Sequence, residues 1–113
     1  MISIKRVYES KSSDDGYRVL VDRLWPRGLS KEKAAIDIWM KDIGPSNELR
    51  KWFNHEAAKW PEFKKRYQDE LKKKKELLES LKKLEKDHGR LTLLYGAHDT
   101  EHNQAVVLAE VLK

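Results

Sequence analysis

The strongest constraint on the fold is a short apolar run near the end of the chain, residues 91–95 (Leu-Thr-Leu-Leu-Tyr). A strand that is apolar along its length must be covered on both faces, which is typical of parallel sheets packed by helices. The run follows Gly89, a typical helix stop. It precedes residues 101–112, whose wide apolar face predicts a helix capped by Asp99 or Thr100. A strand between two helices favours an α/β fold.

The remainder of the chain continues this alternation of strands and helices. Alternating apolar residues predict strands over residues 1–8 and 17–25, and Pro26 ends the second because it cannot donate a ladder hydrogen bond. Helices are predicted over residues 30–35, 47–55 and 60–88. Residues 72–75 interrupt the apolar stripe of the last helix, which either bends there or leaves the body of the protein. Residues 36–40 are too short an apolar stretch to assign. We therefore expect a single α/β domain over residues 1–113. Its short, mostly parallel sheet has about three strands and is packed by helices, one of them long and lysine-rich.

The composition removes several classes of protein. There is no cysteine, which excludes disulfides, thiolate metal sites and a cysteine nucleophile. No apolar run approaches the roughly 20 residues that cross a bilayer, and the N-terminal residues do not form a signal peptide. We therefore expect a soluble, cytoplasmic protein with no membrane partner. The net charge of +5 suggests attraction to phosphates.

The first group of candidate site residues lies in residues 22–28, directly after the second predicted strand. Arg23 and Arg27 carry planar guanidinium groups that match phosphate or carboxylate, and the Trp25 face can hold a base or a cation. Ligands of α/β folds gather at the carboxyl ends of strands. The alternative is structural, because Asp22 can fix one guanidinium in an ion pair that anchors the corner.

The second group opens the helix predicted over residues 47–55. Ser46 is a good N-cap, and the free N–H groups behind it form a natural anion cradle. Arg50 lies one turn into this helix and could face the same ligand. Taken alone, the pattern favours an ordinary capped amphipathic helix with a solvent-facing arginine, because caps are far commoner than ligand sites.

The third group follows the apolar strand. Tyr95 ends that strand, and Asn103 lies at the expected helix start. His102 could act as a general acid or base with Asp99 as its orienting partner. His98 and His102 are four residues apart, but the expected cap places His98 outside the helix, and spacing supplies no third metal ligand. The segment lacks the spacing of a P-loop or a GxGxxG motif. We therefore expect no metal and no bound cofactor.

The four consecutive lysines at residues 72–75 could contact a nucleic-acid backbone. Glu76, Glu79 and Glu85 interleave with lysines at helical spacing, which is typical of a solvated, self-paired face. Surfaces that bind nucleic-acid backbone concentrate one sign of charge. The pattern therefore favours a solvated helix face.

Several of these segments together resemble the YeaO-like family of small prokaryotic proteins, a branch of a larger domain-of-unknown-function family. The most specific match is residues 18–28 (Arg-Val-Leu-Val-Asp-Arg-Leu-Trp-Pro-Arg-Gly). Further matches are Pro45-Ser46, residues 49–53, Phe63 with Tyr67, Glu70-Leu71, residues 93–95, Asp99, and residues 102–105. The resemblance covers nearly the whole chain and implies a compact α/β domain, but no particular reaction. All three groups of candidate residues fall on its motifs, whereas His98 and residues 72–75 do not.

The main functional hypothesis is an anion-binding cleft at the strand ends. Arg23, Arg27 and Arg50 would hold a phosphate- or carboxylate-bearing ligand, and Trp25 and Tyr95 would form the walls. Buried arginines without a partner are costly, so an anion is expected beside them.

Other hypotheses stay open at this stage. If the chain is an enzyme, hydrolysis or transfer on a phosphorylated or nucleotide-like substrate is the natural class, with His102 and Asp99 as the acid/base pair. The alternative function is a non-catalytic nucleic-acid-binding or regulatory module that uses the basic surface. In a third interpretation the arginines are structural and pair with nearby carboxylates, and there is no ligand.

Overall fold

The computed structural model describes residues 1–113 and contains one sheet of four parallel strands in the order β1-β4-β2-β3. The strands are β1 (Ile2–Arg6), β2 (Tyr17–Leu20), β3 (Ile38–Trp39) and β4 (Leu91–Tyr95). The expected α/β class and parallel pairing are confirmed. The expected number of strands was one too few, because the unassigned stretch at residues 36–40 forms the edge strand β3. The central strand β4 is buried at every residue, as its apolar run predicts.

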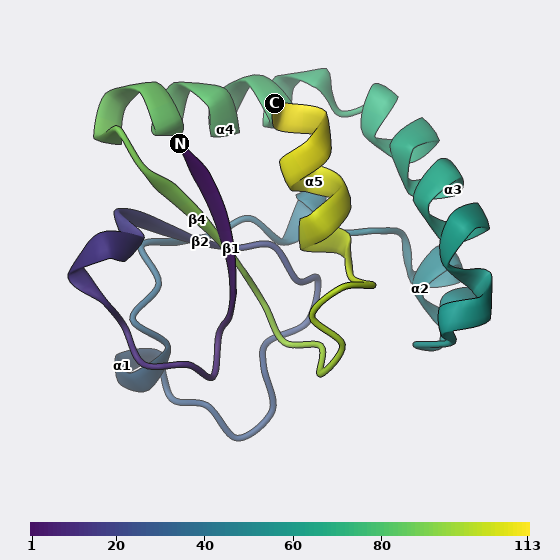
Figure 1. The fold of residues 1–113 in the computed structure, drawn as a ribbon, viewed down its shortest axis with the longest axis horizontal. Coiled ribbons are helices and arrows are strands. Elements are labelled where there is room, and N and C mark those ends of the chain that lie inside the picture. Colours follow the sequence, from purple (N-terminus) through teal and green to yellow (C-terminus); the bar gives the residue numbers. More distant parts are fainter.

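Five α-helices accompany the sheet: α1 (Lys31–Ala34), α2 (Asn47–Phe53), α3 (Trp60–Lys72), α4 (Lys75–His88) and α5 (Gln104–Leu112). In Figure 1, α3, α4 and α5 gather around one side of the sheet, and α1 lies apart from them. No helix has both the length and the apolar character needed to cross a membrane.

The two faces of the sheet carry separate cores. Val19 and Leu93 point into the larger core, which the long helices cover. Leu20 and Leu94 point into a smaller core that includes Ala34 of α1. Successive strand residues point to opposite faces, so β2 serves both cores.

The long helix predicted over residues 60–88 is two helices, and its break has a tertiary cause. The Lys74 side chain turns inward and its Nζ donates to the carbonyl oxygens of Asp42 at 2.7 Å and Gly44 at 3.0 Å. Tyr67 of α3 donates to the Ile43 carbonyl at 2.6 Å. The end of α3 is thus attached to the loop before α2, and α4 starts in a new direction.

Two predicted boundaries were wrong near the strand ends. Strand β2 ends at Leu20, not at residue 25, because after the Val21 N–H bonds the Leu94 carbonyl at 3.0 Å the chain leaves the sheet. Helix α5 begins at Gln104, not at residue 101. Its N-cap is Asn103, whose side chain accepts a bond from the Val106 N–H at 3.2 Å. Both changes lengthen the loops at this edge.

Candidate functional site

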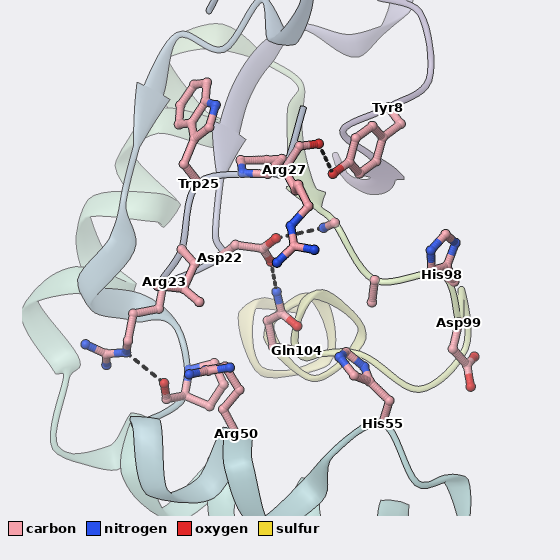
Figure 2. A pocket seen from close by; sticks show the side chains of 15 residues that line it. Tyr8, Asp22, Arg23, Trp25, Arg27, Arg50, His55, His98, Asp99 and Gln104 are labelled. Atoms are coloured by element: carbon pink, nitrogen blue, oxygen red, sulfur yellow. Dashed lines mark hydrogen bonds between the residues drawn. The ribbon is translucent and has the colours of Figure 1, made fainter. Parts of the chain in front are cut away.

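The loops that follow β2 and β4 meet at the carboxyl edge of the sheet, because the two strands are parallel neighbours. They surround a pocket of about 590 Å³, shown in Figure 2. Helices α2 and α5 and the turn after β1 close its sides. The lining residues are Tyr8, Asp22, Arg23, Leu24, Trp25, Pro26, Arg27, Pro45, Arg50, His55, Gly96, Ala97, His98, Asp99 and Gln104. A cavity of this size is in the range of small-molecule sites.

Asp22 lies at the junction of the two loops. Its Oδ2 accepts a bond from the Gly96 N–H at 2.8 Å, and its Oδ1 accepts one from Gln104 Nε2. Burial raises the pKa of Asp22 from 3.8 to about 6, and the bonds from Gly96 and Gln104 offset part of this effect. A Cβ at position 96 would lie 2.9 Å from Asp22 Oδ2, so glycine is needed for the approach. The carboxylate ties β2, β4 and α5 together.

The three arginines predicted for the site have different environments. Arg23 is turned toward the start of α2, and its Nε and Nη2 donate to the carbonyl oxygens of Pro45 at 2.9 Å and Gly44 at 3.3 Å. The exposed Arg27 side chain extends toward the middle of the pocket in Figure 2. Arg50, on α2, holds the one buried side-chain nitrogen or oxygen that has no hydrogen-bond partner, its Nε.

No carboxylate neutralises these arginines. None of the ion pairs in the structure includes Arg23, Arg27 or Arg50. Asp22 also has no cationic partner, although it lies in the same pocket. The structural interpretation in which Arg23 and Arg27 pair with nearby aspartates is therefore wrong.

The two aromatic residues predicted for the walls differ in position. Trp25 borders the pocket, but its Nε1 donates to the Leu29 carbonyl at 2.7 Å, and its ring meets Trp39 edge-on at 5.4 Å. Tyr95 is buried in the larger core, outside the pocket lining, and burial raises its pKa. The aromatic side chain added at the wall is Tyr8, whose hydroxyl donates to the Arg27 carbonyl at 2.9 Å.

The predicted acid/base pair forms, but its histidine lies outside the pocket lining. His102 Nδ1 is 2.8 Å from Asp99 Oδ2, and the His102 ring meets Trp60 edge-on at 5.2 Å. The backbone N–H of Glu101, the bond from His102 and the His102 N–H lower the pKa of Asp99. Asn103 is buried and caps α5. Of these residues only Asp99 borders the pocket.

Ser46 is not among the residues that line the pocket, although its neighbour Pro45 is. Its N–H and hydroxyl donate to Glu70 of α3, at 2.8 Å and 2.7 Å. The hydroxyl also accepts from the Leu49 N–H at 3.2 Å and caps α2, as predicted. An anion does meet this helix start, but it is a carboxylate of the chain itself.

Comparison with known proteins places the chain in a family. The family model described as "Inactive DUF488-N3 subclade" matches residues 1–113. The chain belongs to this subclade. It is 46% identical over 112 residues to the uncharacterised protein YeaO of Escherichia coli (strain K12), covering 99% of this chain and 96% of YeaO. It is 42% identical over 113 residues to uncharacterised proteins of Mycobacterium tuberculosis and Mycobacterium bovis, covering 98% of this chain and 92% of each relative. No solved structure gives a significant match.

In this member of the DUF488-N3 subclade, several lining residues went unnoticed in the sequence. Gln104 is the first residue of α5 and appears as an ordinary helix residue until its bond to Asp22 is seen. His55 follows α2 with φ of 57°, a left-handed conformation that non-glycine residues adopt at a cost. A short helix followed by Asn-His-Glu gives a weak signal for such a turn. No group of three or more His, Asp or Glu side chains could hold a metal ion.

Proposed function

We propose that this chain is a non-catalytic binding protein for a small ligand that bears a phosphate or carboxylate group, held in the pocket at the carboxyl edge of the sheet. The observation that carries the proposal is the Arg50 Nε, a buried donor without an acceptor. Leaving a buried polar group unpaired costs about 1–3 kcal/mol, and more for a charged group. Arg50 borders the pocket, so an anion bound there would offset the charge of its guanidinium.

The three arginines have different roles in the proposed anion binding. Arg27, exposed at the pocket, and Arg50, beneath it, supply the cations that meet the anion. Arg23 has two backbone acceptors already, so it keeps the start of α2 beside the loop. A guanidinium presents paired N–H groups, which suits the oxygens of phosphate and carboxylate.

A binding role without catalysis is supported by the position of His102, the histidine that pairs with Asp99. His102 is held by Asp99 and Trp60, outside the lining of the pocket. No other histidine has a carboxylate partner to orient it. The description of the subclade as inactive agrees with this role.

The test is a thermal-shift screen of the purified protein at low and high salt. The screen includes phosphate, sulfate, small carboxylates, sugar phosphates, nucleotides, divalent metals and short oligonucleotides. A ligand at 100 times its dissociation constant adds about 2.7 kcal/mol, which shifts the Tm of a domain this small by several degrees. We expect a small anion to give this shift in the native protein and in Lys51→Met, and no shift in Arg50→Met. Lys51 is exposed on the same helix and controls for the loss of one positive charge. Equal shifts in the two variants, or no shift with any anion, would contradict the proposal.

The nucleic-acid alternative has less support from the lysine run. Lys74 donates to two backbone carbonyls, and Lys72 lies beside Asp69 at 3.4 Å. Two of the four lysines therefore already have partners within the chain and are less available to a nucleic-acid backbone. A shift with oligonucleotides only, lost at high salt and on reversing the charges of Lys73 and Lys75, would favour this alternative.

A further inference from the structure

The pocket contains an unpaired charge of each sign. Arg50 and Arg27 are cations without a carboxylate, and Asp22 is a carboxylate without a cation. The two donors on Asp22, the Gly96 N–H and the Gln104 amide, are neutral. A ligand that carries only an anion would satisfy one half of this pocket and leave the other half unchanged.

Asp22 has acceptor capacity left for a ligand. An ionised carboxylate offers about four lone-pair sites, and the two bonds use one site on each oxygen. Asp22 is only partly buried and borders the cavity. Figure 2 shows its carboxylate pointing toward the middle of the pocket, with Gln104 below it and the Arg27 side chain reaching down beside it. Burial without a cation also raises the pKa of Asp22, which is the expected cost of a carboxylate in this setting.

The geometry points to a ligand of two opposite charges, with an anionic group, for which a phosphate monoester serves as the probe, at Arg27 and Arg50 and an ammonium group at Asp22. This inference rests on the proposed function and adds the substrate class. Asp22 is then the residue that separates aminated phosphates from plain ones. An ammonium fits better than a metal ion, because no cluster of three His, Asp or Glu ligands exists here.

A purely structural role for Asp22 makes a different prediction. In that case the carboxylate only joins β2 to β4 and α5, and the affinity for a phosphate does not depend on an amine elsewhere in the ligand. The substitution Asp22→Asn separates the two roles. The side-chain carbonyl of the introduced asparagine can still accept from the Gly96 N–H. Its amide can donate to Gln104 once the Gln104 amide turns over, so both bonds are kept.

The experiment measures affinity by isothermal titration with matched pairs of probes. Phosphoethanolamine is paired with ethyl phosphate, and aminobutyl phosphate with butyl phosphate, so that two spacings between the charges are sampled. In the native protein at neutral pH, we expect the aminated member of at least one pair to bind about tenfold more tightly. In Asp22→Asn the ratio should fall to about one. Lys51→Met is the control and should keep the native ratio.

A pH series gives a second readout that a structural role would not move. The amine preference should disappear as the pH falls below about 6, because protonated Asp22 no longer attracts an ammonium. The ammonium lowers the second pKa of the phosphate in the aminated member, so the ratio is compared with the ratio in Asp22→Asn at each pH, where the titration of the ligands is the same. The other charged or titratable side chains around Asp22 are Tyr8, Arg23, Arg27, Arg50, His55, Tyr67, Glu70, His98 and Asp99.

Three results would overturn the inference. Equal binding of both members in the native protein would leave the proposed function standing and remove the amine. A preference that survives in Asp22→Asn would assign the amine to another residue. No binding of any probe, together with no anion shift in the thermal screen, would remove the proposed function and this inference with it.

Discussion

The two ends of strand β2 each carry an aspartate that is at least partly buried, and the two environments are opposite. Asp15, before the strand, receives bonds from the Lys5 ammonium at 3.2 Å and from the Arg18 guanidinium. Burial raises its pKa, but the Ser12 N–H, Lys5 and Arg18 together lower it below the usual value. Asp22, after the strand, has only neutral donors, and its pKa rises to about 6. Similar residue types therefore make two kinds of cluster. The cluster at Asp15 is closed, because its carboxylate is paired with cations, and the cluster at Asp22 is open, because its carboxylate has no cation.

The arginines beside these aspartates differ in the same way. Arg18 has no exposed surface, yet its guanidinium donates to Asp15 and to the carbonyl oxygens of Ala34 and Ala35, each at 2.9 Å. Every nitrogen of that group has an acceptor. Arg50 has a buried Nε with none. Complete pairing is the mark of a structural cluster, and incomplete pairing is what directs attention to the pocket.

The largest expected effect comes from breaking the closed cluster. Arg18→Met should lower the free energy of unfolding by about 3 kcal/mol or more, because Asp15 loses a cation and two carbonyls of the α1 end lose their donor. Urea denaturation measures this. Arg50→Met should not lower the stability and should raise it by about 1 kcal/mol or more, because it removes an unpaired buried donor and breaks no intramolecular bond to it. Equal losses in both variants would contradict the distinction between the two clusters.

The second prediction concerns the pH dependence of stability at Asp22. The folded state binds the Asp22 proton more tightly than the unfolded state, so the native protein loses stability as the pH rises from about 4 to about 6. The Asp22→Asn variant does not lose stability in this way, because the asparagine side chain does not ionise. The variant should be more stable than the native protein by about 3 kcal/mol at about pH 7.5, and the gain should vanish near pH 4. Tm measured across this range is the check, and a constant difference at every pH would argue against the raised pKa.

Asp15 supplies the control for that experiment, because its pKa moves the other way. A lowered pKa contributes stability above the ordinary value of 3.8, which is lost as the pH falls through the folded value. Asp15→Asn should therefore be less stable than the native protein at neutral pH. The two asparagine variants should shift Tm in opposite directions.

The third prediction uses Gly96, whose missing side chain permits the contact with Asp22. In Gly96→Ala the new Cβ would lie 2.9 Å from Asp22 Oδ2, so the carboxylate must move. We expect a loss of about 1–2 kcal/mol in stability, together with a weaker thermal shift by the anion. Gly28→Ala is a comparison at the same edge: its φ of 74° strains an alanine, but no atom lies within 4 Å of the new Cβ. Loss of stability in both variants, with loss of the ligand response in Gly96→Ala only, is the expected pattern.

Sequence reasoning predicted the parts of this comparison that depend on neighbours along the chain. The apolar run of β4 and the alternation of β2 predicted the parallel sheet, and topology then brought Asp22 close to Gly96. The bond from Gln104 to Asp22 could not be predicted, because it joins residues far apart in the chain, and a motif does not show which of its residues meet. The start of α5 was misplaced because Asp99, Thr100 and Asn103 are all good caps. Only the packed position of Asn103 decides among them.

The smallest expected effect concerns Ser46, which sequence reasoning placed with the arginines. Its hydroxyl caps α2 and donates to Glu70, so Ser46→Ala should cost about 1 kcal/mol of stability. Because Glu70 already occupies this helix start and Ser46 lies outside the pocket lining, the thermal shift by the anion should be unchanged once the lower starting Tm is subtracted. The matched control is Ser80→Ala, since Ser80 is exposed on α4 and bonds only the Glu76 carbonyl. Loss of the anion shift in Ser46→Ala, with Ser80→Ala unaffected, would move the anion site from Arg50 to the start of α2 and give Glu70 the role of a competitor for the ligand.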